Sequence, residues 1–282
     1  MIFVSMNIFI TYSDEKYAEA RHLCARMAAC LGRFDRVIEY SPEDIDLEFR
    51  RRYARTFAVQ RGAGLWLWKP FIILKTLEEV ACEGDIVFYA DAGTFFIRRF
   101  RHILKTMKQD VWVSNIPLAE KQYTKKEAFV LMGCEGRAFE DTPQVQGGFV
   151  GIRKSPQSMA FVKEWLSYSC DYRILSPECN PAYTETDCFI AHREDQSVLS
   201  LLCKKHGISF HKDPTQYGRF PEKYSRPYHL CVSAQQTAEY PVMILLHRQP
   251  KVTVRHIFNQ LLHVILPKRV VRLFLSKVYY ER

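Results

Sequence analysis

Short runs of β-branched and aromatic residues alternate with segments of helical period along the first 90 residues, and this alternation constrains the fold most strongly. Residues 2–12 are dense enough in such side chains for a central strand that is buried on both faces. Ser13 is placed to cap a helix that extends to about Leu31, and residues 36–40 then form a second strand. A strand–helix–strand opening of this kind is typical of α/β nucleotide-binding domains.

The same alternation continues to about residue 250. We expect further helices at residues 69–80, 156–168 and 192–205, and further strands at residues 85–90, 111–115, 148–152 and 242–246. The sequence therefore predicts an α/β fold with a mixed, mainly parallel sheet and helices on both faces. A chain of 282 residues has room for one such domain, over residues 1–250, and an appendage over residues 251–282.

The positive charge of the chain is concentrated in this appendage. The formal net charge is +9, and residues 251–282 hold seven Lys or Arg residues but a single acid. A nucleic-acid-binding domain more often carries its charge on the folded body, so this distribution argues against nucleic acid as a partner. A nucleic-acid-binding module stays open as an alternative, in which loss of the appendage would abolish polyanion binding.

Cysteine usage and the N-terminus indicate a cytoplasmic protein. The nine cysteines are odd in number and scattered, without the close pairs of a disulfide framework or a zinc site, so we expect reduced thiols. The apolar N-terminus lacks a basic region and a small-residue cleavage site, and it is interpreted as a strand rather than a signal peptide. No apolar run reaches the ~18 residues of a membrane span.

A carboxylate follows directly after the strand expected at residues 85–90. In open α/β sheets ligands bind outside the carboxyl ends of the strands, which is where Asp91 would lie. The small residues Ala92 and Gly93 would leave it accessible to a ligand or a hard cation that bridges phosphates. A simple Asp-Gly type of turn explains the same three residues equally well.

A glycine-rich segment between two cations is the second candidate. Residues 61–70 (RGAGLWLWKP) place Arg61 and Lys69 on either side of two glycines that permit close backbone approach. A helix begins near Lys69, and helix N-termini favour anions such as phosphate. The alternative is a structural loop whose two tryptophans fill the core.

Two further polar residues are placed near the sheet. Asp195 falls in the first turn of the helix expected at residues 192–205, on the face of that helix that packs on the sheet. His247 directly follows the late strand at residues 242–246. Each has a structural alternative, because first-turn acids complement the helix dipole and single histidines are commonly structural.

Five segments follow one another along the chain: residues 61–70, 84–93 (GDIVFYADAG), 146–152 (QGGFVGI), 192–202 (HREDQSVLSLL) and 213–218 (DPTQYG). In this order they resemble a bacterial family of GT-A glycosyltransferases of capsule, O-antigen and lipopolysaccharide biosynthesis. The resemblance covers roughly residues 7–250. Each segment alone is weakly specific, whereas five in this order are strongly so.

The resemblance implies a donor site for a nucleotide sugar. In it, the first strand and Tyr12 hold the base, and Arg61 and Lys69 lie near the donor. Gly147 and Gly148 match the small-residue segment beside the sugar pocket. A UDP-linked sugar is the donor that we expect.

The resemblance also implies the metal-binding and catalytic residues. Asp91 matches the first acid of the DxD motif and His247 the C-terminal metal-binding histidine, so Mn²⁺ or Mg²⁺ is the expected cofactor. Gly93, which also faces the donor, replaces the second acid of the motif, and cationic side chains are therefore an alternative to the metal. Asp195 and Gln196 match the late acidic motif near the reaction centre.

The expected reaction moves a sugar from the donor to a hydroxyl of a cell-surface polysaccharide or lipid-linked glycan precursor. In an inverting enzyme Asp195 would deprotonate the acceptor hydroxyl. In a retaining enzyme Gln196 would lie under the anomeric carbon while the leaving phosphate acts as base, and the Asp-Gln pair favours this second course. The alternative to an enzyme is a non-catalytic nucleotide-sugar-binding or scaffold protein at the membrane.

The appendage is predicted to form basic amphipathic helices. Pro267 separates two apolar stripes: Val254, Ile257, Phe258, Leu261, Leu262 and Ile265, and then Val270, Val271, Phe274, Leu275 and Val278. Such helices bind anionic bilayer surfaces, which places the protein at the inner face of the plasma membrane as a peripheral protein. Packing of the helices on the body or on a second subunit is the alternative.

Overall fold

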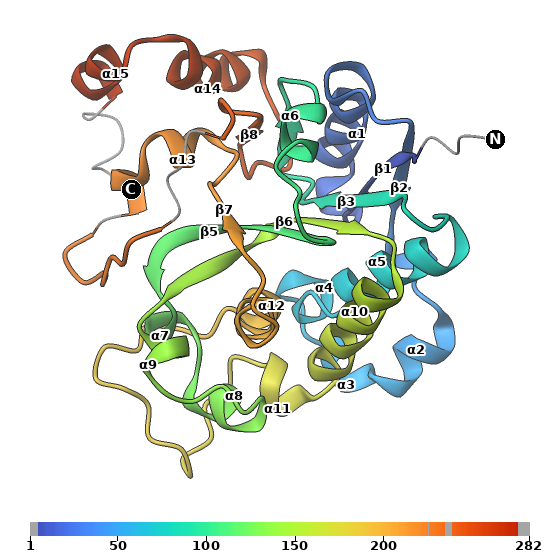
Figure 1. The fold of residues 1–282 in the computed structure, drawn as a ribbon, viewed down its shortest axis with the longest axis vertical. Coiled ribbons are helices and arrows are strands. Elements are labelled where there is room, and N and C mark those ends of the chain that lie inside the picture. The colour runs from blue at the N-terminus through green and yellow to red at the C-terminus, as the bar shows by residue number, and fades with distance from the viewer. Residues whose placement is uncertain (1–4, 225, 235–238, 276–282) are drawn as a thin grey trace.

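A computed structural model describes residues 5–224, 226–234 and 239–275. Its main sheet has six strands in the order β2-β1-β3-β6-β5-β7 (Figure 1). Their bounds are Arg36–Tyr40, Asn7–Tyr12, Ile86–Ala90, Pro143–Arg153, Val111–Ala119 and Phe210–His211. Strands β2, β1 and β3 are parallel, β6 is antiparallel to both β3 and β5, and β7 is parallel to β5.

The predicted fold class is therefore confirmed: the sheet is mixed and mainly parallel, with helices on both faces. The reversed strand β6 determines where the site lies. Its residue Phe149 pairs with Ala90 at the carboxyl end of β3, and Asp91 N donates to Gly148 O over 3.0 Å. The sequence segments at residues 84–93 and 146–152 thus meet at one edge of the sheet.

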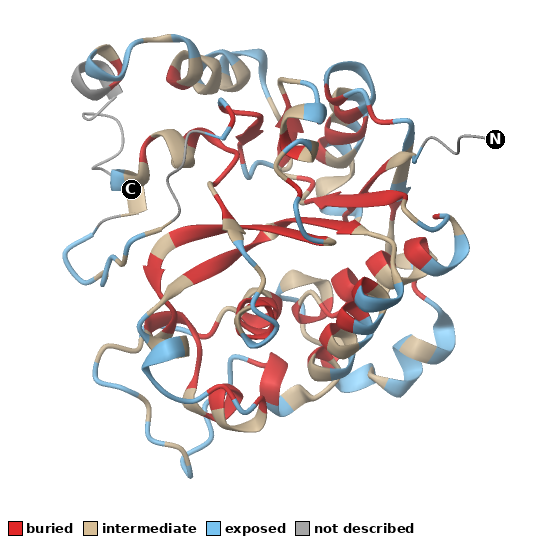
Figure 2. Cartoon of the chain, viewed as in Figure 1, coloured by how far each residue is buried: buried red, intermediate tan, exposed pale blue. Residues whose placement is uncertain are grey.

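Three long helices cover one face of the sheet and enclose the larger core. They are α5 (Trp68–Glu79), α10 (Pro156–Ser169) and α12 (Glu194–Lys205), and Figure 2 shows their sheet-facing sides buried. Ile8, Ile10 and Val87 of the sheet pack against this layer. Alternate residues of β1 and β3 point to opposite faces, so both strands are apolar throughout, as in a sheet covered on two sides.

The other face packs against α1 (Ala18–Met27), α6 (Arg101–Leu104) and a second, two-stranded sheet. That sheet pairs β4 (Thr94–Phe96) with β8 (Ile244–Leu246) in antiparallel fashion. The core here is rich in phenylalanine, since Phe9 and Phe88 of the main sheet meet Phe34, Phe96 and Phe100. The late strand expected at residues 242–246 therefore exists but belongs to the smaller sheet.

The remaining helices are short and lie mostly around the edges of the two layers. Their bounds are Leu47–Arg52 (α2), Ala54–Phe57 (α3), Gly62–Leu65 (α4), Glu120–Tyr123 (α7), Lys126–Leu131 (α8), Arg137–Glu140 (α9), Tyr172–Leu175 (α11) and Gln216–Arg219 (α13). Single turns of tighter helix occupy Glu15–Tyr17, Pro42–Asp44 and Pro221–Tyr224.

The start of the chain differs from the expectation in three details. The first strand begins at Asn7, and residues 2–4 of the predicted strand lie outside the described part. The helix expected from Ser13 is capped by Asp14 instead, whose side chain accepts from Tyr17 N. It also ends in a widened turn at Ala28–Gly32, which lets Arg33 take the left-handed conformation before β2.

The C-terminal segment forms two helices, as predicted, with a break at Pro267. They are α14 (Val254–Ile265) and α15 (Lys268–Leu275). Ile257 and Leu261 of α14 pack against the small sheet, whereas Phe258 and Ile265 remain 59% and 71% exposed. Of the second stripe, Val278 lies outside the described residues, as do the side chains of Phe274 and Leu275. No helix in the described ranges is long and apolar enough to cross a membrane.

Candidate active site

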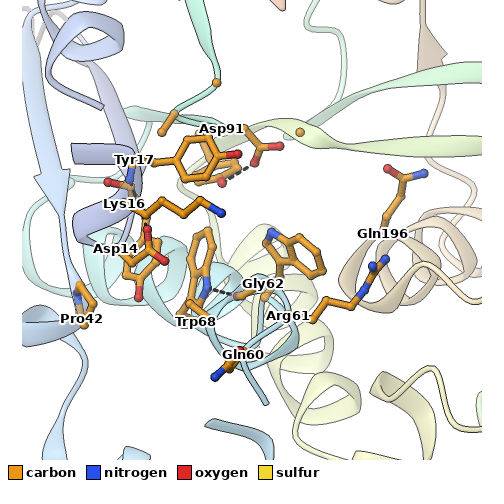
Figure 3. A pocket seen from close by; sticks show the side chains of 18 of the residues that line it. Asp14, Lys16, Tyr17, Pro42, Gln60, Arg61, Gly62, Trp68, Asp91 and Gln196 are labelled. Carbon is orange, nitrogen blue, oxygen red and sulfur yellow. Dashed lines mark hydrogen bonds between the residues drawn. The ribbon is translucent and has the colours of Figure 1, made fainter. Parts of the chain in front are cut away.

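A cleft of about 940 Å³ opens at the edge of the sheet where β1 and β3 end. Tyr12 and Asp14 line it from the end of β1, and Asp91 from the end of β3. Gln196, from the first turn of α12, faces Asp91 across the open space (Figure 3). Of the residues predicted for the donor site, Tyr12, Arg61, Asp91, Gly93 and Gly148 lie on the wall of this cleft, whereas Lys69 and Gly147 are not among its lining residues. The predicted catalytic residue Gln196 also lines it.

Asp91 is an accessible carboxylate on the wall of the cleft, with 41% of its side chain exposed. Tyr89 donates its hydroxyl hydrogen to Asp91 Oδ1 over 2.5 Å, which fixes the orientation of the carboxylate. Gly148 lies beside it: a Cβ atom at this position would approach Asp91 Oδ2 to 3.1 Å. The absence of a side chain at residue 148 is thus what gives the carboxylate its room.

Lys69 lies under the floor of the cleft rather than on its wall. Its ammonium group donates to Asp195 Oδ2 over 2.5 Å and to Gly147 O over 3.0 Å, and lies 3.6 Å from Asp91 Oδ1. Both Lys69 and Asp195 are almost fully buried. The two residues therefore join α5, α12 and β6 beneath Asp91, and neither is open to solvent.

Burial and the neighbouring charges shift the pKa values of Asp195 and Lys69 in opposite directions. Burial raises the pKa of Asp195 to about 6, although the Lys69 ammonium lowers it. Burial alone would lower the pKa of Lys69, but the carboxylates of Asp195 and Asp91 hold it above its ordinary value. At neutral pH both groups are accordingly charged, as an ion pair with a second carboxylate at its edge.

Both ends of the Gln196 amide are held by the protein. Its Oε1 accepts from Gly147 N over 3.1 Å, and its Nε2 donates to Gln144 Oε1 over 2.7 Å. A Cβ atom on Gly147 would lie 3.0 Å from the Gln196 Cβ, so α12 reaches this close only because residue 147 is glycine. The amide retains one N–H and one lone pair that can face a ligand.

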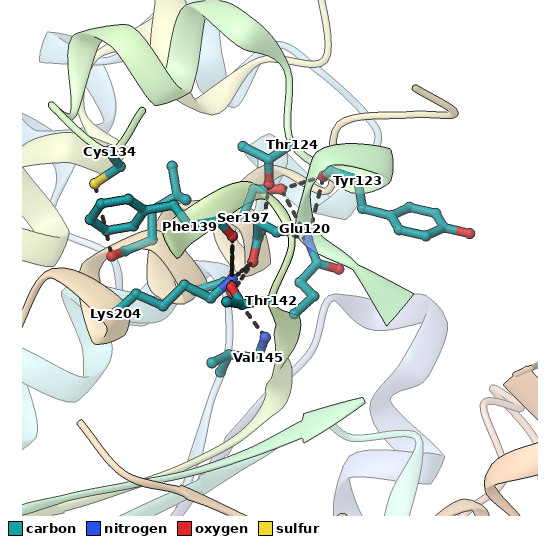
Figure 4. Close-up of polar contacts among 12 residues, drawn as sticks. Glu120, Tyr123, Thr124, Cys134, Phe139, Thr142, Val145, Ser197 and Lys204 are labelled. Atoms are coloured by element: carbon teal, nitrogen blue, oxygen red, sulfur yellow. Dashed lines mark hydrogen bonds and ion pairs between the residues drawn. The ribbon is translucent and has the colours of Figure 1, made fainter. Parts of the chain in front are cut away.

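A buried polar network supports this arrangement from behind (Figure 4). Glu120, which is fully buried at the end of β5, accepts from Lys204 Nζ over 2.5 Å and from Gln144 Nε2 over 3.1 Å. It also accepts from the hydroxyls of Thr124 and Ser200. The network ties α12 to the sheet at both ends of the helix and sets the orientation of the Gln144 amide.

The glycine-rich segment forms a left-handed turn. Gly62 and Gly64 have φ angles of +61° and +98°, and a Cβ atom on Gly62 would collide with the ring of Trp66. Trp68 Nε1 donates to Gly62 O over 2.9 Å. These glycines are required by the backbone, as the structural interpretation of this segment expects. Both tryptophans also line the cleft.

Arg61 is engaged by an acid that the sequence analysis did not select. Its guanidinium donates to both carboxylate oxygens of Glu194, over 2.5 Å and 3.4 Å. Glu194 is buried and has a φ angle of +40°, a strained conformation for a non-glycine residue at the start of α12. In the sequence, Glu194 cannot be distinguished from any acid in the first turn of a helix, and Gln144 cannot be distinguished from any residue of a strand. Neither residue could therefore be selected as functional from the sequence alone.

Aromatic rings form the wall of the cleft nearest β1. The rings of Tyr12 and Trp68 stack with centroids 3.8 Å apart and planes inclined by 21°. Burial raises the pKa of Tyr12, which keeps its hydroxyl protonated. Tyr17 and Trp66 continue this wall toward solvent, and such faces suit a flat ring such as a nucleobase.

The residues predicted to hold a divalent cation do not fit one in this geometry. His247 is not among the residues that line the cleft, and its Nε2 atom is buried without a hydrogen-bond partner among the described residues. Its Nδ1 accepts from Gln249 N over 3.1 Å, which leaves the ring hydrogen on Nε2 and removes the lone pair that a metal needs there. Burial lowers the pKa of His247 to about 4, so the ring is neutral.

The backbone packing around Gly93 leaves no room for a second acid, which a complete DxD motif would have at this position. A Cβ atom at this position would lie 3.0 Å from the Cα atom of Arg248, which is backbone and cannot yield easily. Within the described residues, moreover, no three His, Cys, Asp or Glu side chains converge as metal ligands do. We therefore route no chemical step through a metal.

No protein-family model matches the sequence, and no curated protein matches it. Similar solved structures include the galactosyltransferase LgtC with donor and acceptor sugar analogues, at 14% identity over 93% of this chain and 98% of that chain (TM-score 0.48). GlyE, a glycosyltransferase of Streptococcus pneumoniae, matches at 13% identity over 98% and 64% of the two chains (TM-score 0.47). Mouse xyloside xylosyltransferase 1 matches at 11% identity over 86% and 97% (TM-score 0.43). Because each likeness is this weak, the proposal below rests on the residues of the cleft.

Proposed function

We propose that the protein is a glycosyltransferase that takes its sugar from a nucleoside diphosphate sugar. The observation that carries the proposal is the placement of Asp91 and Gln196 on facing sides of a cleft at the carboxyl ends of parallel strands. Nucleotide ligands bind at this edge of α/β sheets. A volume of about 940 Å³ lies near the upper end for small-molecule sites, which suits a ligand as large as a nucleotide sugar.

The cleft offers a different chemistry to each part of such a donor. The aromatic wall with Tyr17 and Trp66 accepts the base, and UDP is the nucleotide that we favour. Asp91 accepts hydrogen bonds from sugar hydroxyls, with Gly148 leaving space beside it. Gln196 then lies at the far end, where the transferred sugar meets its acceptor.

In the reaction, the bond between the anomeric carbon and the diphosphate oxygen breaks, and its electron pair leaves with the diphosphate. The acceptor hydroxyl oxygen bonds to the anomeric carbon, and its proton goes to a base. Asp195 is poorly placed as that base, because its carboxylate is buried and paired with Lys69. We therefore favour retention, with the leaving diphosphate taking the proton while the Gln196 amide supports the positive charge that develops on the sugar.

We further propose that the acceptor is a lipid-linked or cell-surface glycan reached at a membrane. Support comes from α14, where Val254, Phe258 and Ile265 are exposed although apolar, beside the basic residues Arg255 and Lys268. Exposed apolar side chains next to cations are the pattern of helices that bind anionic bilayers. Such a protein acts as a peripheral protein on the cytoplasmic face.

A donor screen tests the proposal. Purified protein is incubated with UDP-, GDP- and other nucleoside diphosphate sugars, with Mn²⁺ or with EDTA, and release of the nucleoside diphosphate is followed. We expect release from one donor, lost in Asp91→Ala and kept in the surface control Asp187→Ala. Binding of one donor without release, with or without a glycan acceptor, would favour the non-catalytic alternative. Absence of both binding and release for every donor would overturn the proposal.

A further inference from the structure

A cationic side chain, Arg248, lies on the wall of the cleft near Gly93, the position at which the second acid of the DxD motif would help to hold a metal ion. Arg248 lines the cleft together with Asp91 and Gly93. Among the described residues, no carboxylate lies within 4 Å of its guanidinium, in contrast to Arg61, which is paired with Glu194. The guanidinium carbon lies 5.8 Å from the centroid of the Tyr217 ring.

The backbone fixes Arg248 next to the loop that bears Asp91. Strand β8 pairs with β4, so the chain after Leu246 runs alongside residues 91–93. The N–H groups of His247 and Arg248 both donate to Gly93 O, over 2.8 Å and 2.9 Å. Arg248 also has a φ angle of +55°, and a left-handed non-glycine residue persists only where its surroundings hold it there.

The same contact excludes the residue that would bind a metal. Any side chain at position 93 would press on the Arg248 backbone, as the 3.0 Å approach to its Cα atom shows. The close packing of this loop on the backbone of residue 248 therefore leaves no room for a carboxylate at position 93, while Arg248 adds a cation to the lining of the same cleft. The guanidinium is permanently charged and offers paired N–H groups that match two oxygens of a phosphate.

From this geometry we propose that Arg248 binds the diphosphate of the donor and stabilises it as the leaving group, in place of a divalent cation. The inference rests on the proposed function and adds the residue that stabilises the negative charge of the leaving group. As the bond to the anomeric carbon breaks, negative charge grows on the departing phosphate oxygen, and the Arg248 N–H groups donate to that oxygen. Asp91 is then free to accept hydrogen bonds from sugar hydroxyls rather than to hold a metal.

Binding measurements test this assignment without relying on turnover. Calorimetry is done with UDP, GDP and inorganic pyrophosphate as probes, in EDTA and again with excess Mn²⁺. We expect wild-type protein to bind at least one nucleoside diphosphate and pyrophosphate in EDTA, with little gain from Mn²⁺. Arg248→Ala should weaken binding about tenfold to a hundredfold, since it removes a charged partner of the phosphates. Arg248→Lys should recover part of the loss, because charge remains while the paired donors do not.

The surface variant Arg137→Ala serves as the control for a general change in charge and should bind as the wild type does, and thermal unfolding checks that each variant is folded. Binding that requires Mn²⁺, or that is unchanged in folded Arg248→Ala, would overturn the role of Arg248 while leaving glycosyl transfer intact. If neither a nucleoside diphosphate nor pyrophosphate binds under either condition, the role of Arg248 is overturned as well. The donor screen then separates this case, since donor turnover would show that the proposed function survives.

Discussion

Lys69 Nζ lies 2.5 Å from Asp195 Oδ2 and 3.6 Å from Asp91 Oδ1, so a single buried cation connects the hidden acid with the exposed one. The ion pair of Lys69 and Asp195 is closed to solvent. Through its contacts, α5, α12 and β6 meet beneath the cleft. Within the proposed function, Lys69 is therefore a positioning residue, which acts through Asp91 and the segment of β6 around Gly147.

Removal of this cation should destabilise the protein strongly. Lys69→Met leaves Asp195 buried without its partner, and breaking a buried pair in this way costs about 3–5 kcal/mol of unfolding free energy. The exposed pair of Lys163 and Glu78 provides a matched control, because Lys163→Met should cost about 1 kcal/mol or less. Urea unfolding measures both. Equal small losses in the two variants would show that the Lys69 pair does not hold the site together.

Gln144 should affect catalysis although it does not line the cleft. Its Oε1 accepts from Gln196 Nε2, so Gln144→Leu frees the amide that faces the sugar. We expect kcat to fall about tenfold, against about a hundredfold in Gln196→Ala, with KM for the donor changed less in both. Steady-state kinetics with the donor from the screen gives these values, and the exposed Gln157→Ala is the control. A rise in KM alone would assign both glutamines to donor binding instead.

The neighbouring glycines Gly147 and Gly148 of β6 should differ in their response to alanine. In Gly147→Ala the new methyl group meets the Gln196 Cα and Cβ atoms, which belong to a packed helix, so we expect a loss of about 1–3 kcal/mol in stability. In Gly148→Ala it meets only the end of the Asp91 carboxylate. This variant should stay stable but bind the donor more weakly. Unfolding and calorimetry together distinguish the two cases, and the reverse order of stabilities would contradict the packing described.

His192 should make the protein sensitive to acid. Burial lowers the pKa of His192 to about 3, far below its ordinary value of 6.5. Between pH 6.5 and about pH 3, His192 binds a proton in the unfolded chain but not in the folded chain. The free energy of unfolding is therefore unaffected by this titration above pH 6.5, and it decreases progressively as the pH falls below 6.5. The contribution to the slope is about 1.4 kcal/mol per pH unit.

Urea unfolding of His192→Gln at a series of pH values measures this effect. Its stability should fall less steeply below pH 6.5 than that of the wild type, and His102→Gln, at a half-buried surface position, should parallel the wild type. Parallel curves for all three proteins would show that His192 does not contribute to acid sensitivity.

The sequence predicted the sheet and the edge at which the cleft lies, because both follow from local patterns. Apolar runs identify β1 and β3 as buried strands, and the residue after such a strand, Asp91, must lie at a ligand-binding edge. The glycine pair at residues 147–148 was also selected, and the structure gives each glycine a specific close neighbour.

What the sequence did not predict depends on contacts between distant segments. Lys69 was expected beside the donor, but its partner Asp195 lies 126 positions away, and no periodicity encodes their pairing. Arg248 was not selected either. It follows a short strand whose partner, β4, is itself three residues long, so its place beside Gly93 emerges only from the folded small sheet.

A crystal structure with the donor identified by the screen tests the central claim most directly. We expect the base against Tyr17 and Trp66, the sugar between Asp91 and Gln196, and the diphosphate in contact with the Arg248 guanidinium. A donor bound outside the cleft, or a diphosphate held away from both Asp91 and Arg248, would contradict the proposed site.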